Sequence, residues 1–160
     1  MKRIYAPWRY KYVSDPNSEG CIFCKAVKSE NDRENGVLFR GEFSFVLMNK
    51  YPYNNGHLMV VPFQHTDTFE TLRSEERLEM MDLLQNAQEA LQNSCSPHGF
   101  NIGMNLGRVA GAGIDEHLHF HIVPRWNGDT NFMPTLAGTR VIPQSLEAAW
   151  ELLTEALSKR

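Results

Sequence analysis

The stretch from Glu116 to Pro124 constrains this chain more than any other, because it carries histidine at three alternate positions. Successive side chains of a β-strand point to opposite faces of the sheet. A strand here would place His117, His119 and His121 on one face and the apolar residues between them on the other. The apolar face predicts packing on a core. A face of three imidazoles indicates metal binding, or nucleophilic and proton-transfer chemistry.

The composition narrows the class of protein. The chain has 160 residues, 42% hydrophobic and 22% charged, which predicts one domain over 1–160. Within it, we expect an aromatic-rich N-terminal arm at 1–20 and a helix-bearing C-terminal extension at 126–160. A net charge of -3 predicts neither nucleic acid nor a membrane surface as a partner. No apolar run approaches the roughly 20 residues that span a bilayer. With no secretion signal and only three cysteines, the chain is expected to be cytoplasmic.

Hydrophobic patterns predict an α+β fold. Strands are expected at five places, and together they would form a mostly antiparallel sheet of about five strands. The expected strands are 37–40, 43–49, 57–62, 100–106 and 116–124. One long helix would lie across this sheet, and a further helix is expected near the C-terminus.

The helices have recognisable ends in the sequence. The long helix is expected at 75–94, with Ser74 as its N-cap and a row of apolar residues on one face. The C-terminal helix is expected to follow Ser145, which can cap it in the same way. A short helix is expected from Cys21 to about residue 29, and the polar run 29–36 predicts a loop.

Three chemical uses of the histidines are open. Alternate residues of a strand lie about 6.5–7 Å apart, so two can share a zinc ion, whereas three in a row would be strained. One imidazole could instead be a nucleophile that its neighbour assists, or the histidines could divide between a structural metal and the reaction. The motif Cys21-x-x-Cys24 favours this division, because it is half of a tetrahedral zinc site that His65 and His117 could complete. The same motif also occurs in redox proteins and by coincidence.

Several motifs, in one order along the chain, resemble the histidine triad (HIT) superfamily of nucleotide-binding hydrolases and transferases. They are Gly56-His57-Leu58-Met59-Val60-Val61-Pro62-Phe63-Gln64-His65, Asn105-x-Gly107 and His117-x-His119-x-His121-Ile122-Val123. The runs 51–53, 97–101 and 124–132 are similar to bacterial diadenosine tetraphosphate phosphorylase-like members. The resemblance covers about residues 21–125. It implies a HIT-like fold and a homodimer that joins two sheets edge to edge.

The resemblance also implies a reaction at the α-phosphate of an AMP-containing nucleotide, such as a dinucleoside polyphosphate. The middle histidine, His119, would attack this phosphate to form a nucleotidyl-histidine intermediate, which water or phosphate would release. His121 would donate hydrogen bonds to the phosphate oxygens. His57 would lie behind the nucleophile and orient its ring, and Asn105 would fix the phosphate or the neighbour of the nucleophile.

Further residues are expected to bind the nucleotide. Asn49 matches a position that, as an Asp in many family members, holds the ribose hydroxyls. The backbone N–H groups of Gly111, Ala112 and Gly113 would cradle phosphate oxygens, since glycines let the chain approach closely. Arg125 lies near the triad and could bind distal phosphates, although an exposed arginine is usually only solvated.

In zinc-bearing members of the superfamily, a CxxC motif pairs with two histidines. Carried over to this chain, the ligands are Cys21, Cys24, His65 and His117. Four protein ligands leave no open position, so this zinc would be structural and would not act as a Lewis acid. No organic cofactor is implied.

One stretch departs from the pattern of hydrolytic relatives. Many of them place Ser, Thr or Gln before the triad to protonate the leaving group, whereas residues 111–116 here contain no hydroxyl group. Hydrolysis and phosphorolysis with inorganic phosphate therefore both stay open. Two rivals from other classes are a nucleotide-binding regulatory module with weak turnover and a zinc-only structural protein. The second rival would leave His119 and His121 without a task.

Overall fold

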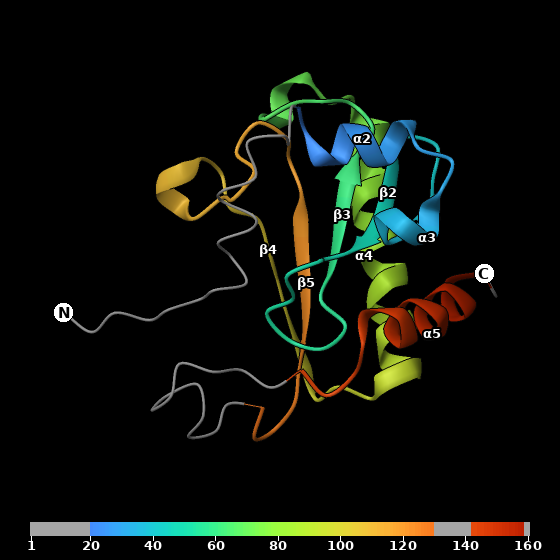
Figure 1. Cartoon of the computed structure of the whole chain (residues 1–160). Helices are drawn as coiled ribbons and strands as arrows, with labels where there is room; N and C mark the ends of the chain where they lie inside the picture. Colours follow the sequence, from blue (N-terminus) through green and yellow to red (C-terminus); the bar gives the residue numbers. More distant parts are fainter. Residues whose placement is uncertain (1–19, 130–141, 159–160) are drawn as a thin grey trace.

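The computed structural model describes residues 20–129 and 142–158, and the statements below concern these ranges. Nearly all of the predicted N-terminal arm, and residues 130–141 of the predicted extension, lie outside them. Five strands form one antiparallel sheet in the order β1-β2-β3-β5-β4 (Figure 1). Their bounds are β1 Val37–Arg40, β2 Ser44–Met48, β3 Leu58–Pro62, β4 Gly99–Gly103 and β5 Phe120–Arg125. The predicted α+β class and five-stranded HIT-like sheet are confirmed.

One face of the sheet is covered by α4 (Ser74–Cys95) and α5 (Leu146–Ser158). The apolar stripe predicted for the long helix is buried against alternate residues of the strands, among them Val46, Val60 and Ile122. Leu118 and Phe120 join the same core, so the apolar side of the histidine stretch packs as predicted. In the described part of the chain, no helix is long and apolar enough to cross a membrane.

The opposite face is covered over only part of its width. The short helix α2 (Ile22–Lys28) packs there, and Phe23 and Ala26 meet the other alternate strand residues in a second, smaller core. This second core draws on β1, β2 and β3, so α2 lies over that half of the sheet (Figure 1). The histidines project from this face beside α2.

Two predicted strands are shorter than expected. β5 begins at Phe120, so His117 and His119 lie in the segment before it. The ladder cannot extend further because β3 ends at Pro62, which has no N–H, and the N–H of Leu118 donates to Thr66 O at 2.6 Å instead. β4 ends at Gly103, three residues before the predicted end.

The remaining differences concern helix ends and short turns. A helix α3 (Asp32–Asn35) occupies the predicted loop, because the Asn31 side chain caps it by accepting from the Glu34 N–H. The N-cap of α4 is Arg73, one residue earlier than predicted, and Ser74 is already helical. Short 3-10 helices occur at η1 (Phe69–Thr71) and η2 (Arg108–Ala110). Ser145 caps α5 as predicted, since its Oγ accepts from the Ala148 N–H at 3.2 Å.

Candidate functional site

Four side chains converge where α2 meets the histidine segment. The ligand atoms of Cys21, Cys24, His65 and His117, hereafter the metal cluster, all lie within 4.8 Å of one another. Nδ1 of His117 lies 3.3 Å from Cys21 Sγ, 3.7 Å from Cys24 Sγ and 3.2 Å from His65 Nδ1, and His65 Nδ1 lies 3.3 Å from Cys24 Sγ. A tetrahedral zinc site with bonds of about 2.3 Å to sulfur and 2.0–2.1 Å to nitrogen has ligand–ligand edges of about 3.3–3.8 Å. The cluster can therefore hold a metal ion, as predicted.

The ring of His117 is oriented for this purpose. Its second nitrogen, Nε2, lies 2.9 Å from the carbonyl oxygen of Pro62, which can only accept a hydrogen bond. Nε2 therefore carries the hydrogen and Nδ1 presents its lone pair to the cluster. A backbone carbonyl on the second ring nitrogen is the common support of a metal-ligating histidine.

The ring of His119 carries its hydrogen on the other nitrogen. Its Nδ1 lies 2.9 Å from the backbone oxygen of His117, so Nδ1 donates and Nε2 keeps the lone pair. The ring is 5% exposed, with the Phe23 ring centroid 5.0 Å away on one side and the His121 ring 4.8 Å away on another. In this tautomer the lone pair of the ring is on Nε2.

A second chain of hydrogen bonds defines the protons of His121. The backbone N–H of Tyr53 donates to His57 Nδ1 at 3.1 Å, so the hydrogen of a neutral His57 is on Nε2. That nitrogen lies 3.0 Å from His121 Nδ1 and donates to it. His121 must then carry its own hydrogen on Nε2, where it can donate to a ligand.

These contacts bear on the role predicted for His57, which stays a prediction. His57 was expected to orient the ring of the nucleophile, but its hydrogen-bond partner is His121. The carbonyl of His117 orients His119 instead. The physical reason is that Met59 of β3 pairs with His121 of β5, which brings the residue before β3 beside that ring.

The pKa values of His57 and His121 lie well below 7, so these two rings are neutral near pH 7. Burial, together with the neighbouring His121 and His119, lowers the pKa of His57 to about 3. Burial lowers the pKa of His121 to about 4, with a further contribution from His119. Burial also lowers the pKa of His119, although its hydrogen bond to His117 opposes the shift. Neutral rings have one donor and one acceptor nitrogen, which the hydrogen bonds above require.

The predicted phosphate cradle is only partly available. The N–H of Gly111 donates to Arg108 O at 3.0 Å, and the N–H of Ala112 donates to Gly107 O at 3.4 Å. Both amides therefore close the turn of the loop itself, and their binding of phosphate stays a prediction. Gly113 is exposed.

The structure shows the protein partners of Arg125, whose binding of phosphate stays a prediction. Its guanidinium donates to Asp129 at 2.6 and 2.8 Å and to Asn101 Oδ1 at 2.8 Å. It lies four residues beyond His121 along β5, about 13 Å at the rise of a strand. Arg125 therefore serves a structural ion pair at the far end of the strand.

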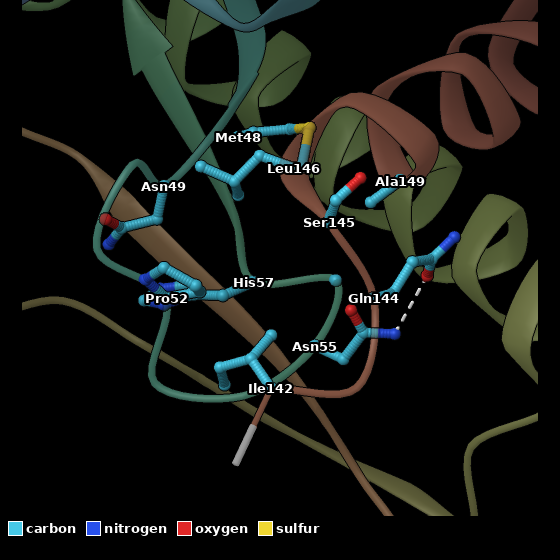
Figure 2. Close-up of a pocket in the computed structure, with 11 residues that line it drawn as sticks. Met48, Asn49, Pro52, Asn55, His57, Ile142, Gln144, Ser145, Leu146 and Ala149 are labelled. Carbon is cyan, nitrogen blue, oxygen red and sulfur yellow. Dashed lines mark hydrogen bonds between the residues drawn. The ribbon is translucent and has the colours of Figure 1, made fainter. Parts of the chain in front are cut away.

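Asn49 lies beside His57, and the roles expected for Asn49 and Asn105 stay predictions. Asn49 follows β2, and its Oδ1 accepts from the Tyr51 N–H at 2.8 Å. It lines a small cavity, with His57, between the loop after β2 and the start of α5 (Figure 2). Asn105 is half-buried two residues beyond β4. Gly103 pairs with His121, so the same register, continued, would bring Asn105 opposite His119.

Two residues of the site were not singled out from the sequence. Tyr53 sets the tautomer of His57 through its backbone, and its ring lies 4.5 Å from that of His57. Phe23 is fully buried against the rings of His117 and His119. The signal for Phe23 was its position between the two cysteines. A backbone donor such as Tyr53 leaves no signal in side-chain chemistry.

Comparison with known proteins agrees with this geometry. Residues 30–128 match the family model of the HIT domain. An AP-4-A phosphorylase from Mycobacterium tuberculosis is 40% identical, over 96% of this chain and 83% of that protein. Adenosine 5'-monophosphoramidase hnt1 from Schizosaccharomyces pombe is 27% identical, over 86% of this chain and 98% of that protein. Among solved structures, a Zn-bound histidine triad family protein from Mycobacterium smegmatis has a TM-score of 0.69 and 28% identity, covering 88% of this chain and 94% of that one.

Proposed function

The chain belongs to the HIT family of nucleotide-processing enzymes, and from this premise we propose that it transfers a nucleotidyl group through His119. The substrate is an AMP-containing nucleotide, with a dinucleoside polyphosphate such as diadenosine tetraphosphate as the first candidate. The single observation that supports this most is the pair of opposite nitrogens: a lone pair on His119 Nε2 beside a hydrogen on His121 Nε2. A nucleophile and a hydrogen-bond donor side by side are what attack on a phosphate requires.

The proposed reaction has two steps. In the first, the lone pair of His119 Nε2 forms a bond to the α-phosphorus, and the bond from phosphorus to the bridging oxygen breaks. The leaving polyphosphate takes the electron pair, while His121 donates to a non-bridging oxygen. In the second, an oxygen of phosphate or water attacks the phosphorus, and the N–P bond breaks to return the lone pair to His119; when water attacks, its proton passes to the solvent.

Phosphate is the favoured acceptor in this proposal. Residues 111–116 contain no hydroxyl that could protonate the leaving polyphosphate of the first step, and this feature favours neither phosphate nor water as the acceptor of the second. The relative that is 40% identical over most of the chain is named an AP-4-A phosphorylase, which favours phosphate as the acceptor. Hydrolysis is the alternative outcome of the same intermediate.

We further propose that the metal cluster binds zinc and that the chain forms a homodimer. The cluster has the two thiolates and two imidazoles that zinc prefers, and a four-ligand zinc ion would supply rigidity rather than chemistry. β4 is an edge strand of the sheet, and Ile102 and Leu106 on and beside it are about half exposed. Pairing of the β4 edges of two subunits would cover both edge strands and these apolar side chains.

The test of the reaction is a trapped adduct. Intact mass after mixing with diadenosine tetraphosphate should show one added AMP on the wild type and none on His119→Ala. His98→Ala is the matched control, because His98 is an exposed histidine on a loop and should keep the adduct. An adduct that persists in His119→Ala would refute the assignment of the nucleophile.

The products identify the acceptor. With inorganic phosphate present, ADP plus ATP indicates phosphorolysis, whereas AMP plus ATP indicates hydrolysis. If the wild type binds nucleotide without an adduct or products, and His119→Ala keeps the full biological effect, the chain is instead a nucleotide-binding regulatory module.

A further inference from the structure

The ring of Phe23 connects the metal cluster to the nucleophile. Phe23 lies between Cys21 and Cys24 in the chain and has no exposed surface. Its ring centroid is 5.3 Å from that of His117, edge-on at 74°, and 5.0 Å from that of His119 at 49°. One side chain therefore touches both a predicted metal ligand and the proposed nucleophile.

The imidazole of His119 is confined on several sides by this arrangement. The carbonyl of His117 holds Nδ1, the ring of His121 stands nearly perpendicular at 80°, and Phe23 lies against the ring itself. A buried aromatic neighbour restricts the side-chain torsions of His119, because a change of rotamer would collide with it. Phe23 cannot touch a substrate, since its surface is entirely covered by protein.

The two ends of α2 are anchored in different ways. At the C-terminal end, the guanidinium of Arg40 donates to the carbonyl oxygens of Ala26 at 2.8 Å and of Val27 and Ser29 at 3.2 Å. At the N-terminal end, which carries Phe23, the polar anchors are the two cysteines of the metal cluster. Loss of the metal would therefore release the end that carries Phe23 while Arg40 keeps the other end docked.

We propose that Phe23 is a positioning residue, through which the metal cluster holds the His119 ring in its reactive orientation. This inference rests on the proposed function only for the identity of the reaction. A bound ion would hold the segment Cys21–Cys24 in place. The ring of Phe23 would then stay against the ring of His119 and prevent it from turning. The metal itself takes no part in the reaction.

The experiment compares Phe23→Leu with Phe45→Leu. Phe45 is a matched control because it is also fully buried in the same small core, but its ring stacks on Phe63 at 5.5 Å rather than on a histidine. Both changes remove the same atoms from the same core and should lower stability to a similar extent. Zinc content of both variants, measured by metal analysis, should equal that of the wild type.

Two readouts separate positioning from general damage. Phe23→Leu should slow adduct formation in a single turnover by about tenfold or more, because misplacing a reacting group by about 1 Å costs about 10²-fold. Its KM should stay unchanged, and Phe45→Leu should keep the wild-type rate. Equal rates in the two variants, or a loss confined to KM, would overturn the proposal.

The second readout does not depend on activity. Long-range ¹H–¹⁵N correlation spectra report which nitrogen of His119 carries the hydrogen, and the wild type should show the single form with hydrogen on Nδ1. Phe23→Leu, and the wild type after removal of metal with a chelator, should both show a mixture of forms. A single unchanged form in both would refute the proposal. If the wild type forms no adduct but the spectra change as expected, the proposed reaction fails while the positioning role stands.

Discussion

Replacing Cys24 by Ser should remove the metal from this protein and expose how much it contributes to stability. The four ligands come from three separate segments, and Cys21 and His117 are 96 positions apart. His65 and His117 are 52 positions apart. The unfolded chain therefore cannot present all four ligands together, so the ion binds the folded state far more strongly than the unfolded one.

The magnitude follows from mass action. A ligand that binds only the folded state at 100 times its Kd stabilises that state by about 2.7 kcal/mol. A change of 1 kcal/mol shifts the Tm of a chain of this size by about 2–4 °C. Cys24→Ser should therefore lower the Tm of the zinc-saturated protein by about 5–11 °C. The loss should be larger if the free zinc concentration is more than about 100 times the Kd.

The assay is thermal unfolding followed by circular dichroism, with metal analysis of the same samples. Cys95→Ser is the control, because Cys95 is the third cysteine and packs against the large core away from the cluster. It should keep one zinc per chain. A chelator should lower the Tm of the wild type and of Cys95→Ser but not that of Cys24→Ser. The absence of metal from the wild type after growth with zinc, or a Tm that the chelator does not change, would refute the prediction that a bound metal ion stabilises the fold.

Three further predictions concern packing and pH. Gly41→Ala should cost about 1–3 kcal/mol of unfolding free energy, because its Cβ would lie 2.6 Å from Glu79 Oε1 and displace a carboxylate that accepts two backbone hydrogen bonds. Leu91→Ala should cost about 2–5 kcal/mol, since Leu91 is fully buried in the large core. The unfolding free energy should be constant above about pH 6.5 and fall as the pH drops toward 4, by up to ~1.4 kcal/mol per pH unit for each of His57 and His121. The reason is that the pKa values of these two histidines in the folded protein, about 3 and about 4, lie below the value of about 6.5 in the unfolded chain.

Each of these has its own check in urea denaturation. Gly99→Ala, where a Cβ would meet no atom within 4 Å, should leave stability nearly unchanged, and a loss equal to that of Gly41→Ala would contradict the steric argument. Leu78→Ala, on the exposed side of the same helix, should cost far less than Leu91→Ala. His57→Leu should flatten the pH dependence, and an unchanged slope would show that other groups cause it.

Much of the site was readable from residue spacing. Alternation of histidines and apolar residues correctly predicted which side chains enter the core, because a side chain alternates its direction in any extended backbone, even before the strand begins. The CxxC motif and the resemblance named four ligands that the fold does bring together. The ion pair of Arg125 was not predicted, because position near the triad in sequence says nothing about the partner that a guanidinium finds in space. Asp129, four residues later, is that partner.

The sequence by itself determined the candidate groups of the site, the strand and helix periods, and hence the α+β fold. It could not decide which nitrogen of each histidine carries the hydrogen, because that depends on backbone carbonyl and N–H groups that every residue possesses. Only the tertiary structure placed the carbonyls of Pro62 and His117 and the N–H of Tyr53 against three different rings. Three identical side chains acquire different chemistry through these contacts: His117 presents Nδ1 to the metal cluster, His119 keeps a lone pair on Nε2, and His121 keeps a hydrogen there.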